Sequence, residues 1–412
     1  MPGGFLLGCS APASHLNGRS IRSSSPHNFP RGRRPRIAND NSLLTLADDF
    51  QQSNSMKRIS VIAPHFQEYS LLFANALSRH GPVRLFIDLK RLKSEFSDRQ
   101  MPVAANVTIQ HVGLNSILDV FRIFFGMLRS RPNELFVQEA SGLLKSIICA
   151  CVVTVARPFC KIVLTVHDPV PHSGRDAAIA GRLDRFRRYV RGRAHVVLVH
   201  GRYCYDEYVA NHNFPGQKVH ITEHGVILSD GDATETPAAP FSVLFFGRME
   251  EYKGVDVLCE ATEILKDENI DFRLRIAGRG PEIDRFQQRY ERIPGVEVLN
   301  TFVPAKGLVE SIVDADCVVL PYLSATQSGV LAGAFANGRF VIASRVGGIP
   351  DIVTHMEDGI LVPPNDPRAL ADALKLAASD RELRQRLKAG ARHTTDTRLR
   401  WDRIVDNLRS VC

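Results

Sequence analysis

Residues 242–278 read SVLFFGRMEEYKGVDVLCEATEILKDENIDFRLRIAG, and this stretch indicates the fold. Two short apolar runs, SVLFFG and FRLRIAG, flank a segment from Val255 to Lys266 whose pattern is typical of a helix. Short buried strands that alternate with helices favour a parallel sheet covered by helices on both faces. The stretch therefore predicts one strand–helix–strand unit of an α/β domain.

The same alternation continues on both sides of this unit. Towards the C-terminus, a helix near Glu282 to Arg292 is followed by the strands VEVLN, CVVLPY, FVIAS and GILVP. Towards the N-terminus, helical stretches separate the strands RISVIA, VRLFID, VTIQHV, ELFVQ, KIVLTVHD, HVVLVH and KVHITEH. We therefore predict an α/β protein with two doubly wound Rossmann-like domains.

Changes in composition give the predicted boundaries. The first residues are rich in Ser, Pro, Asn and Gly and carry the basic cluster RGRRPR, whereas SDGDATETPAAP lacks large apolar residues and is typical of a linker. The predicted segments are a disordered tail or mis-assigned start over 1–55, a first Rossmann-like domain over 56–228, a linker over 229–240, a second Rossmann-like domain over 241–395, and a C-terminal helix over 396–412 that packs back on the first domain.

Composition and cysteine spacing exclude several classes of protein. The 412 residues are 44% hydrophobic and 23% charged, which excludes collagenous, coiled-coil and wholly disordered chains. The net charge of +8 is too small to indicate nucleic-acid binding. None of the eight cysteines forms a C-x-x-C pair, so we expect reduced thiols in a cytoplasmic protein. The apolar run from Ile147 to Ala156 is too short to span a membrane.

The loops after the strands are where ligands of open α/β sheets bind. Gly278 and Gly280 are followed by Ile283, so the dinucleotide fingerprint G-x-G-x-x-G is absent, and the sequence contains no Walker A motif. Nicotinamide-dependent hydride transfer and P-loop phosphate chemistry therefore lose support, and we expect no cofactor. His167 and His172 flank D-P-V-P, but no third ligand at recognisable spacing supports a metal site.

Two loops of the second domain carry residues suited to a diphosphate. In GRMEEYKG, Arg248 and Lys253 flank a turn into a helix, where cations and helix amides together neutralise phosphate oxygens. In SATQSGVLAGAFANG, hydroxyls, an amide and a glycine precede a helix of small residues. Each loop also has a purely structural interpretation, as solvated cations in the first and as ordinary helix capping in the second.

The second half of the sequence resembles the donor domain of the retaining GT-B glycosyltransferases of family 4, also described as glycosyl transferases group 1. The resemblance covers residues 242–391 through VLFFGRMEEYKGVDVL, LRIAGRGPE, ADCVVLPY, GRFVIASRVGGIPDIV and EDGILVPPNDPRALADAL. It implies two domains facing across a cleft, with acceptor residues in the first and a nucleotide-sugar donor in the second. In the first half, LTVHDPVPH, HVVLVHG and ITEHGVIL are similar to the family's strand ends, but PHFQEYS replaces its glycine pair.

The resemblance also implies site residues. Arg248 and Lys253 would hold the donor diphosphate, and His167 would face the reacting sugar. The implied donor-binding residues are Gly247, Arg248, Lys253, Gly278, Thr326, Gln327, Ser328 and Gly329. The two carboxylates of the family's signature are missing, because Ala325 and Gly333 occupy their positions.

The resemblance implies a metal-independent hexosyltransferase that retains the anomeric configuration and transfers a sugar to a glycan or a lipid-linked saccharide in polysaccharide biosynthesis. Arg248, Lys253 and helix amides would stabilise the leaving diphosphate, and no D-x-D segment lies in a suitable loop. Two alternatives stay open. The missing carboxylates would suit a non-catalytic sugar-nucleotide-binding partner subunit, and the two Rossmann-like domains would also suit a nucleotide-sugar epimerase.

The segment GRLDRFRRYVRGR concentrates positive charge in the first domain. Arg182, Arg185, Arg188 and Arg191 would either contact anionic lipid headgroups or a lipid-pyrophosphate acceptor, or form a solvated charged helix. The first alternative would place a cytoplasmic enzyme at the inner face of the membrane as a peripheral protein. The cluster has few interleaved aromatic side chains, so nucleic-acid binding is not expected.

Overall fold

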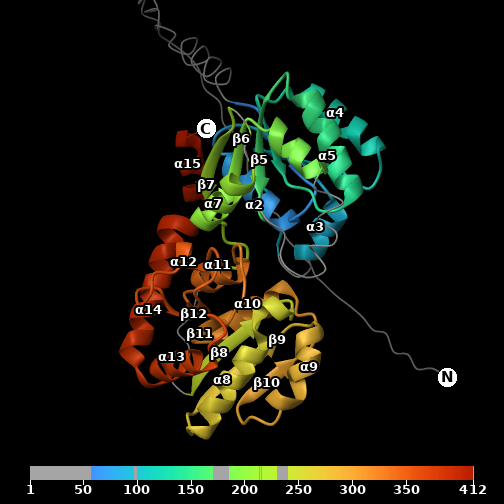
Figure 1. Ribbon diagram of the computed structural model, residues 1–412. Coiled ribbons are helices and arrows are strands. Elements are labelled where there is room, and N and C mark those ends of the chain that lie inside the picture. Colours follow the sequence, from blue (N-terminus) through green and yellow to red (C-terminus); the bar gives the residue numbers. More distant parts are fainter. Residues whose placement is uncertain are drawn as a thin grey trace, which may run out of the picture. The chain divides into compact units, whose positions relative to one another are not determined.

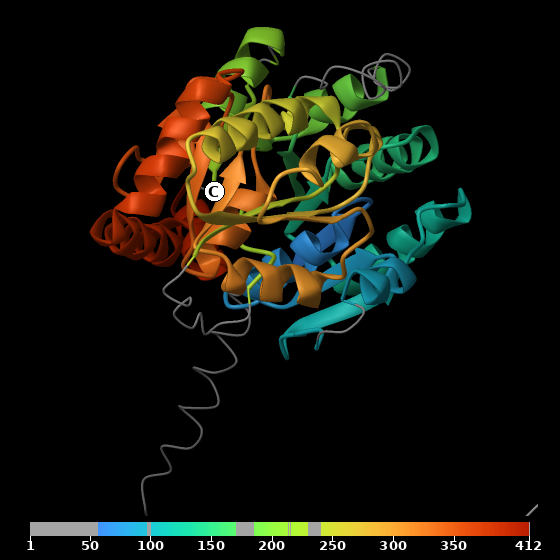
Figure 2. The same ribbon diagram turned by 90° about the horizontal axis from the view of Figure 1, so that it is seen from below.

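The computed structural model describes residues 57–96, 100–169, 185–212, 214, 216–229 and 240–411. Over these ranges the chain forms two parallel sheets, each flanked by helices (Figure 1), and the view turned by 90° shows the same layering (Figure 2). The predicted α/β class with two doubly wound sheets is confirmed. The predicted tail over 1–55 and most of the predicted linker over 229–240 lie outside the described residues.

The first sheet has the strand order β3-β2-β1-β4-β5-β6-β7, and all of its neighbouring strands pair in parallel. Its strands are β1 (Ile59–Ala63), β2 (Val83–Ile87), β3 (Val107–His111), β4 (Glu134–Gln138), β5 (Lys161–Val166), β6 (Val196–His200) and β7 (Lys218–Thr222). Its helices are α2 (Gln67–Leu77), α3 (Leu89–Phe96), α4 (Leu118–Ser130), α5 (Leu143–Ala156) and α7 (Gly201–Asn211), and residues 185–193 are also helical. The central strands β1, β4 and β6 are buried along their whole length, as expected for continuous apolar runs in a parallel sheet.

The second sheet has the order β10-β9-β8-β11-β12-β13 and is likewise parallel. Its strands are β8 (Phe241–Phe246), β9 (Phe272–Ala277), β10 (Val296–Leu299), β11 (Cys317–Leu320), β12 (Phe340–Ser344) and β13 (Gly359–Val362). Its helical segments are η1 (Glu251–Lys253), α8 (Val255–Asp267), α9 (Pro281–Tyr290), α10 (Ala305–Asp314), α11 (Gly329–Ala336), α12 (Ile349–Ile352), α13 (Pro367–Ser379), α14 (Arg381–Thr394) and η2 (Thr395–Leu399).

The strand orders locate the ligand-binding ends of the two sheets. In each sheet the order reverses beside the first strand: β1 lies between β2 and β4, and β8 lies between β9 and β11. Loops that leave such neighbouring strands diverge to opposite faces and open a crevice at the carboxyl ends. In the second sheet, these loops are the two that the sequence predicts to bind the diphosphate.

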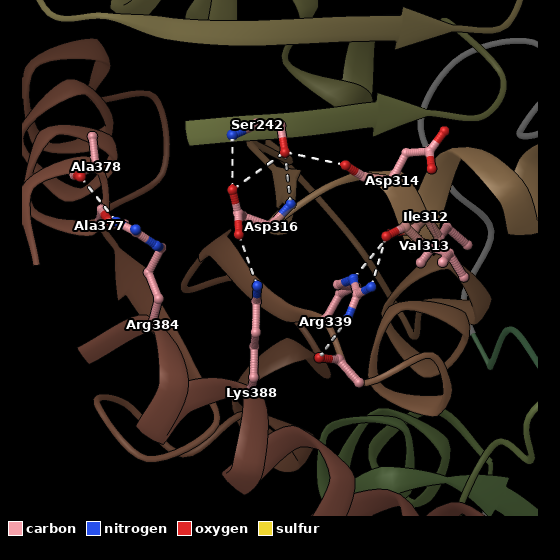
Figure 3. A network of polar contacts seen from close by, with 11 residues as sticks. Ser242, Ile312, Val313, Asp314, Asp316, Arg339, Ala377, Ala378, Arg384 and Lys388 are labelled. Carbon is pink, nitrogen blue, oxygen red and sulfur yellow. Dashed lines mark hydrogen bonds and ion pairs between the residues drawn. The ribbon is translucent and has the colours of Figure 1, made fainter. Parts of the chain in front are cut away.

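A buried polar network fixes the opposite, amino ends of the switch-point strands β8 and β11 (Figure 3). The Asp316 carboxylate accepts hydrogen bonds from the Ser242 backbone N–H at 3.0 Å and from the Lys388 ammonium of α14 at 2.7 Å. Arg339 has no exposed surface and donates to the carbonyls of Ile312 and Val313 at the end of α10. The network therefore satisfies a helix C-terminus and ties two strands and two helices together, far from the loops at the carboxyl ends.

The C-terminal helix α15 (Trp401–Val411) packs against α2 of the first domain. The Trp401 indole N–H donates to the Val226 carbonyl at 2.6 Å, and its ring meets the Tyr69 ring edge-on at 4.8 Å between centroids. The side chains of Val405 and Leu408 belong to the same apolar cluster as β1 and α2. The chain thus returns from the second domain to cover a face of the first.

Candidate functional site

The loop after β8 carries the first predicted donor-binding residues. Backbone contacts set its conformation: a Cβ at Gly278 would lie 1.9 Å from the Gly247 carbonyl oxygen, and a Cβ at Gly254 would lie 1.9 Å from the Pro321 oxygen. Both glycines also have positive φ angles, 151° and 65°. Only glycine fits at these two positions, so the loops after β8, β9 and β11 can pack directly on one another.

Lys253 is a buried cation without a carboxylate partner among the described residues. Its ammonium lies 3.8 Å from the centroid of the Tyr322 ring and 5.3 Å from that of Tyr252, in cation–π contacts. Burial lowers the pKa of Lys253 to about 8; Tyr252 opposes this shift, and the Arg248 guanidinium adds to it. Arg248 itself is exposed on the same loop. An anion bound here would relieve the cost of keeping two neighbouring cations uncompensated.

The loop after β11 differs in detail from the predicted phosphate cradle. The Thr326 hydroxyl donates to Asp168 Oδ1 at 2.6 Å, and the Ser328 hydroxyl oxygen caps α11 by accepting the Leu331 N–H at 3.3 Å. Gln327 Oε1 is buried and has no hydrogen-bond partner in the described part of the chain. The two hydroxyls therefore have structural partners, which leaves the Gln327 side chain and the start of α11 at Gly329 as the groups that face a ligand.

The packing of Leu228 accounts for the absence of a carboxylate side chain at residue 333. Gly333 is buried on α11, and a Cβ there would lie 3.2 Å from Leu228 Cβ. The adjacent Asn337 side chain holds the Leu228 carbonyl by a hydrogen bond of 2.9 Å, so Leu228 is fixed in place. Ala325 is also buried, and its carbonyl packs against Gly347. At residue 333, an apolar side chain from the end of the first domain occupies the space that a carboxylate would need.

Replacing Gly333 by glutamate is therefore expected to leave transfer activity no higher than in the native chain. The added side chain must displace Leu228 and bury a charge, which we expect to cost about 1–3 kcal/mol of stability. Donor-dependent activity and urea unfolding measure the two effects. Ala325→Glu tests the other position, and a rise in activity in either variant would show that these positions still accept the family's carboxylates.

Four histidines converge at the carboxyl ends of the first sheet. His65 follows β1, His167 follows β5, His200 ends β6 and His224 follows β7. The ring centroids of His167 and His200 lie 4.8 Å apart, and those of His200 and His224 lie 5.4 Å apart. Burial lowers the pKa of His200 to about 3, lowers those of His65 and His224 to about 4, and holds that of His167 well below its ordinary value. The cluster is therefore neutral at physiological pH.

Gln138 fixes the orientation of His167. His167 Nε2 lies 2.8 Å from Gln138 Oε1, which can only accept, so Nε2 carries the proton and Nδ1 keeps a lone pair. Nδ1 is buried and has no partner among the described residues. The Tyr69 ring packs edge-on at 5.0 Å and closes another side of the imidazole. His167 can thus accept a hydrogen bond but is too weak a base to take a proton at neutral pH.

Sequence reasoning missed His200, His224, Gln138 and Tyr69. A signal was present, because several apolar strands end in a histidine, as in HVVLVHG and ITEHGV, and parallel strands bring their carboxyl ends together. Gln138 ends β4, which lies between β1 and β5 in the sheet. Tyr69 lies on α2 and gives no comparable signal.

Contacts join the histidine loops to the donor-domain loops within the described residues. Besides the bond from Thr326 to Asp168, the Tyr203 N–H at the start of α7 donates to Asp351 Oδ2 at 2.8 Å. A Cβ at Gly329 would lie 3.6 Å from His224 Cε1, which places the start of α11 beside the histidine cluster. His167, through the next residue Asp168, is therefore linked to the second predicted anion loop.

The arginine segment does not present all of its cations to solvent. Arg185 and Arg188 are exposed, but Arg191 is 3% exposed, which contradicts its predicted contact with lipid. Its guanidinium donates to Glu139 at 2.7 and 2.8 Å and to the carbonyls of Pro169 and Asp168 at 3.2 and 3.4 Å. Arg191 therefore holds the loop that follows His167. Arg182 and His172 lie outside the described residues.

In the part of the chain that the structure describes, no three or more His, Cys, Asp or Glu side chains, the clustered histidines included, are placed so that they could hold a metal ion. The arrangement that this part does contain is a pair of neighbouring cations on the loop after β8 and a cluster of neutral imidazoles that lies beside the start of α11. Such a site can bind a diphosphate through its cations and recognise hydroxyl groups through uncharged nitrogens.

The sequence is similar to those of known glycosyltransferases. Residues 240–380 match the family model described as Glycosyl transferases group 1. D-inositol 3-phosphate glycosyltransferase of Jonesia denitrificans is 31% identical over 219 residues, which are 47% of this chain and 51% of that protein. The name of another relative, from Escherichia coli (strain K12), refers to colanic acid biosynthesis; it is 31% identical over 170 residues, 39% of this chain and 42% of that protein. The matches thus span about two fifths to one half of these relatives.

Solved structures agree over most of the chain. Anabaena HepE in complex with UDP and glucose superposes with a TM-score of 0.65 at 15% identity, covering 86% of this chain and 99% of that one. A sucrose-phosphate synthase from Thermosynechococcus elongatus has a TM-score of 0.66 at 18% identity, covering 86% and 97%. At this identity the likeness establishes the fold, which is GT-B as predicted.

Proposed function

We propose that the chain transfers a sugar from a nucleotide-diphosphate sugar to a hydroxyl acceptor with retention of configuration, and the match of residues 240–380 to the family model of glycosyl transferases group 1 supports this proposal. The observation that carries the proposal is Lys253, a buried cation with no anionic partner among the described residues, on the loop shared with Arg248. Its place between the loops after β8 and β11 is where the doubly wound topology directs a ligand.

In the proposed reaction the glycosidic C–O bond to the diphosphate breaks as the acceptor hydroxyl attacks on the same face of the sugar. The departing phosphate oxygen receives the proton of that hydroxyl, so no protein base is consumed. Lys253, Arg248 and the amides at the start of α11 stabilise the negative charge that develops on the diphosphate. We propose that these groups suffice without a metal ion, which a chelator in the assay tests directly.

His167 acts in this proposal as a neutral acceptor for a hydroxyl group of the donor sugar. The buried Nδ1 lone pair and the protonated Nε2 held by Gln138 suit that role. Because burial holds its pKa well below the ordinary range, His167 would orient the sugar and would not act as a general base. Gly247 and Gly278 shape the loop around the diphosphate, and Gln327 would contact the donor in place of a carboxylate.

The acceptor in this proposal is a glycan or a lipid-linked saccharide in polysaccharide biosynthesis. Support comes from the relative whose name refers to colanic acid biosynthesis. Donor identity follows from a screen of UDP-, GDP- and ADP-sugars by thermal stabilisation, since a ligand that binds only the folded state raises the melting temperature. Anabaena HepE, solved with UDP and glucose, makes UDP-glucose the first donor to test.

One set of assays separates this function from its competitors. Transfer to an acceptor with retention, followed by NMR of the anomeric proton, would support the proposal. Binding of a sugar nucleotide without turnover over a panel of acceptors would favour the non-catalytic partner subunit, which the absence of carboxylates at Ala325 and Gly333 keeps as a second candidate. Conversion of the free donor without any acceptor would instead favour an epimerase.

A further inference from the structure

An exposed apolar surface covers α4 and α5, which pack side by side in the first domain (Figure 1). Ten large apolar side chains of these helices and their ends are exposed to solvent: Ile117, Leu118, Phe121, Phe124, Phe125, Leu128, Leu143, Leu144, Val155 and Phe159. Phe125 is 65% exposed and Phe159 is 81% exposed. We name these ten residues the α4–α5 face. A contiguous apolar surface of this kind is typical of a docking site.

These ten side chains are not needed to complete the hydrophobic core of the first domain. The inward side of α4 is already formed by Ile123 and Gly126, both buried. A Cβ at Gly126 would lie 2.6 Å from the Phe86 ring, which shows how closely the helix already approaches the sheet. A small movement of α4 towards the sheet would therefore not bury the outward-facing phenylalanines. They line a groove between the two helices with a volume of about 750 Å³.

The charges around the α4–α5 face indicate what kind of partner it would bind. Two acidic groups of the described residues lie nearby, and both are buried and paired: Asp119 with Arg122 at 2.8 Å, and Glu134 with Lys57 at 2.8 Å. The exposed charges at the ends of the two helices are the cations Arg129, Arg131 and Arg157. Aromatic side chains that project outward beside arginines are suited to a surface with anionic headgroups above an apolar interior.

We propose that the α4–α5 face docks on the surface of a bilayer that contains anionic phospholipid. Phe121, Phe125 and Phe159 would insert below the headgroups, and the arginines would bind the phosphates while their aliphatic stems lie along the apolar surface. None of the described helices is long and apolar enough to cross a membrane, so these helices would lie on the bilayer. This surface replaces the arginine helix, whose Arg191 is buried, as the membrane contact.

The groove lined by Phe121, Phe125 and Phe159 lies apart from the proposed transfer site. The other end of the α4–α5 face, at Leu118 and Leu143, begins the two helices nearer the carboxyl ends of the strands. The groove reaches Arg58 before β1, Asn133 before β4 and Cys160 before β5, which are the amino ends of the strands. The histidine cluster and the donor loops lie at the carboxyl ends. The proposal therefore goes beyond the proposed function, and each of the two can fail without the other.

Vesicle sedimentation of the full chain tests the proposal. We expect binding to phosphatidylcholine vesicles that contain about 30% phosphatidylglycerol, weak binding to pure phosphatidylcholine, and loss of binding at high salt. The double variant Phe125→Glu/Phe159→Glu should bind at least about tenfold less tightly, because two apolar anchors become anions. Both sites are exposed, so an unchanged melting temperature should accompany the loss.

A matched control adds the same two charges elsewhere. Val209→Glu/Leu376→Glu replaces apolar residues that are 47% and 41% exposed on α7 and α13, and it should bind vesicles as the native chain does. Equal binding of the two double variants, no binding of the native chain, or self-association that Phe125→Glu/Phe159→Glu abolishes would each overturn the proposal. Calorimetry with UDP should give the same affinity for all three proteins, which separates this result from a failure of the proposed function.

Discussion

Replacing Lys253 by methionine is expected to lower kcat/KM for sugar transfer by about 100- to 1000-fold while the fold remains intact. Methionine keeps the apolar contacts with the Tyr252 and Tyr322 rings and removes only the charge. The ammonium is buried and has no carboxylate partner among the described residues, so its charge is available to the diphosphate oxygens, and in the variant Arg248 and the amides of α11 would be left to stabilise them alone. Removal of the ammonium should even relieve the cost of burying the cation, so the melting temperature without ligand should not fall.

The pKa of Lys253 adds a signature that a merely structural residue would not give. Its pKa of about 8 lies below the ordinary value of 10.5, so the free protein loses this charge as the pH rises through about 8. A bound diphosphate favours the charged form and raises the pKa, so binding should take up protons near pH 8. Affinity for UDP should therefore fall above that pH, and calorimetry in buffers of different ionisation enthalpy should detect the uptake.

Lys266→Met is the matched control, since Lys266 is exposed near the end of α8, the helix that follows Lys253. It should change neither the activity nor the proton uptake. A Lys253→Met protein with native activity, or with native proton uptake at unchanged UDP affinity, would contradict the assigned role.

The strands and the cationic loop could be predicted because both depend on local sequence. Apolar runs such as SVLFFG become buried strands whatever surrounds them, and Arg248 and Lys253 lie on one short loop whose position follows from strand order. The histidine cluster depends on long-range pairing instead: His167, His200 and His224 come together only after the strands that precede them have found their order in the sheet. Their individual motifs were visible in the sequence, but their convergence was not.

One error of the sequence interpretation and one gap in it have the same physical origin. Arg191 was grouped with solvent-facing arginines because its helix is basic, yet its partner Glu139 lies 52 residues earlier. Gly333 was recognised as a missing carboxylate, but the reason is Leu228, which lies 105 residues before it and packs on α11. In both cases a side chain distant in sequence decides burial, and no local pattern reports it.

Replacing Arg191 by methionine is expected to lower the free energy of unfolding by about 3–5 kcal/mol. The Glu139 side chain is only 9% exposed, so without Arg191 its carboxylate stays buried and unpaired. The carbonyls of Asp168 and Pro169 lose a donor in the same step. Urea unfolding measures the loss, and Arg188→Met on the same helix is the control, since that side chain is exposed and should cost little.

The same substitution should also impair the proposed transfer, because Arg191 holds the loop that follows His167 from two sides. It binds Glu139, which follows the His167 partner Gln138, and it binds the backbone of Asp168, which follows His167 itself. We expect kcat to fall by about 10- to 100-fold as His167 shifts, while UDP affinity, which depends on Lys253 and Arg248, stays near native. Arg191→Lys should recover little, since one ammonium cannot make the paired bonds to the carboxylate. Replacing Glu139 by leucine in addition should restore most of the stability but not kcat, because the unpaired charge is gone while the loop still lacks its donor. If stability and kcat returned together, Arg191 would only stabilise the fold and would not position His167.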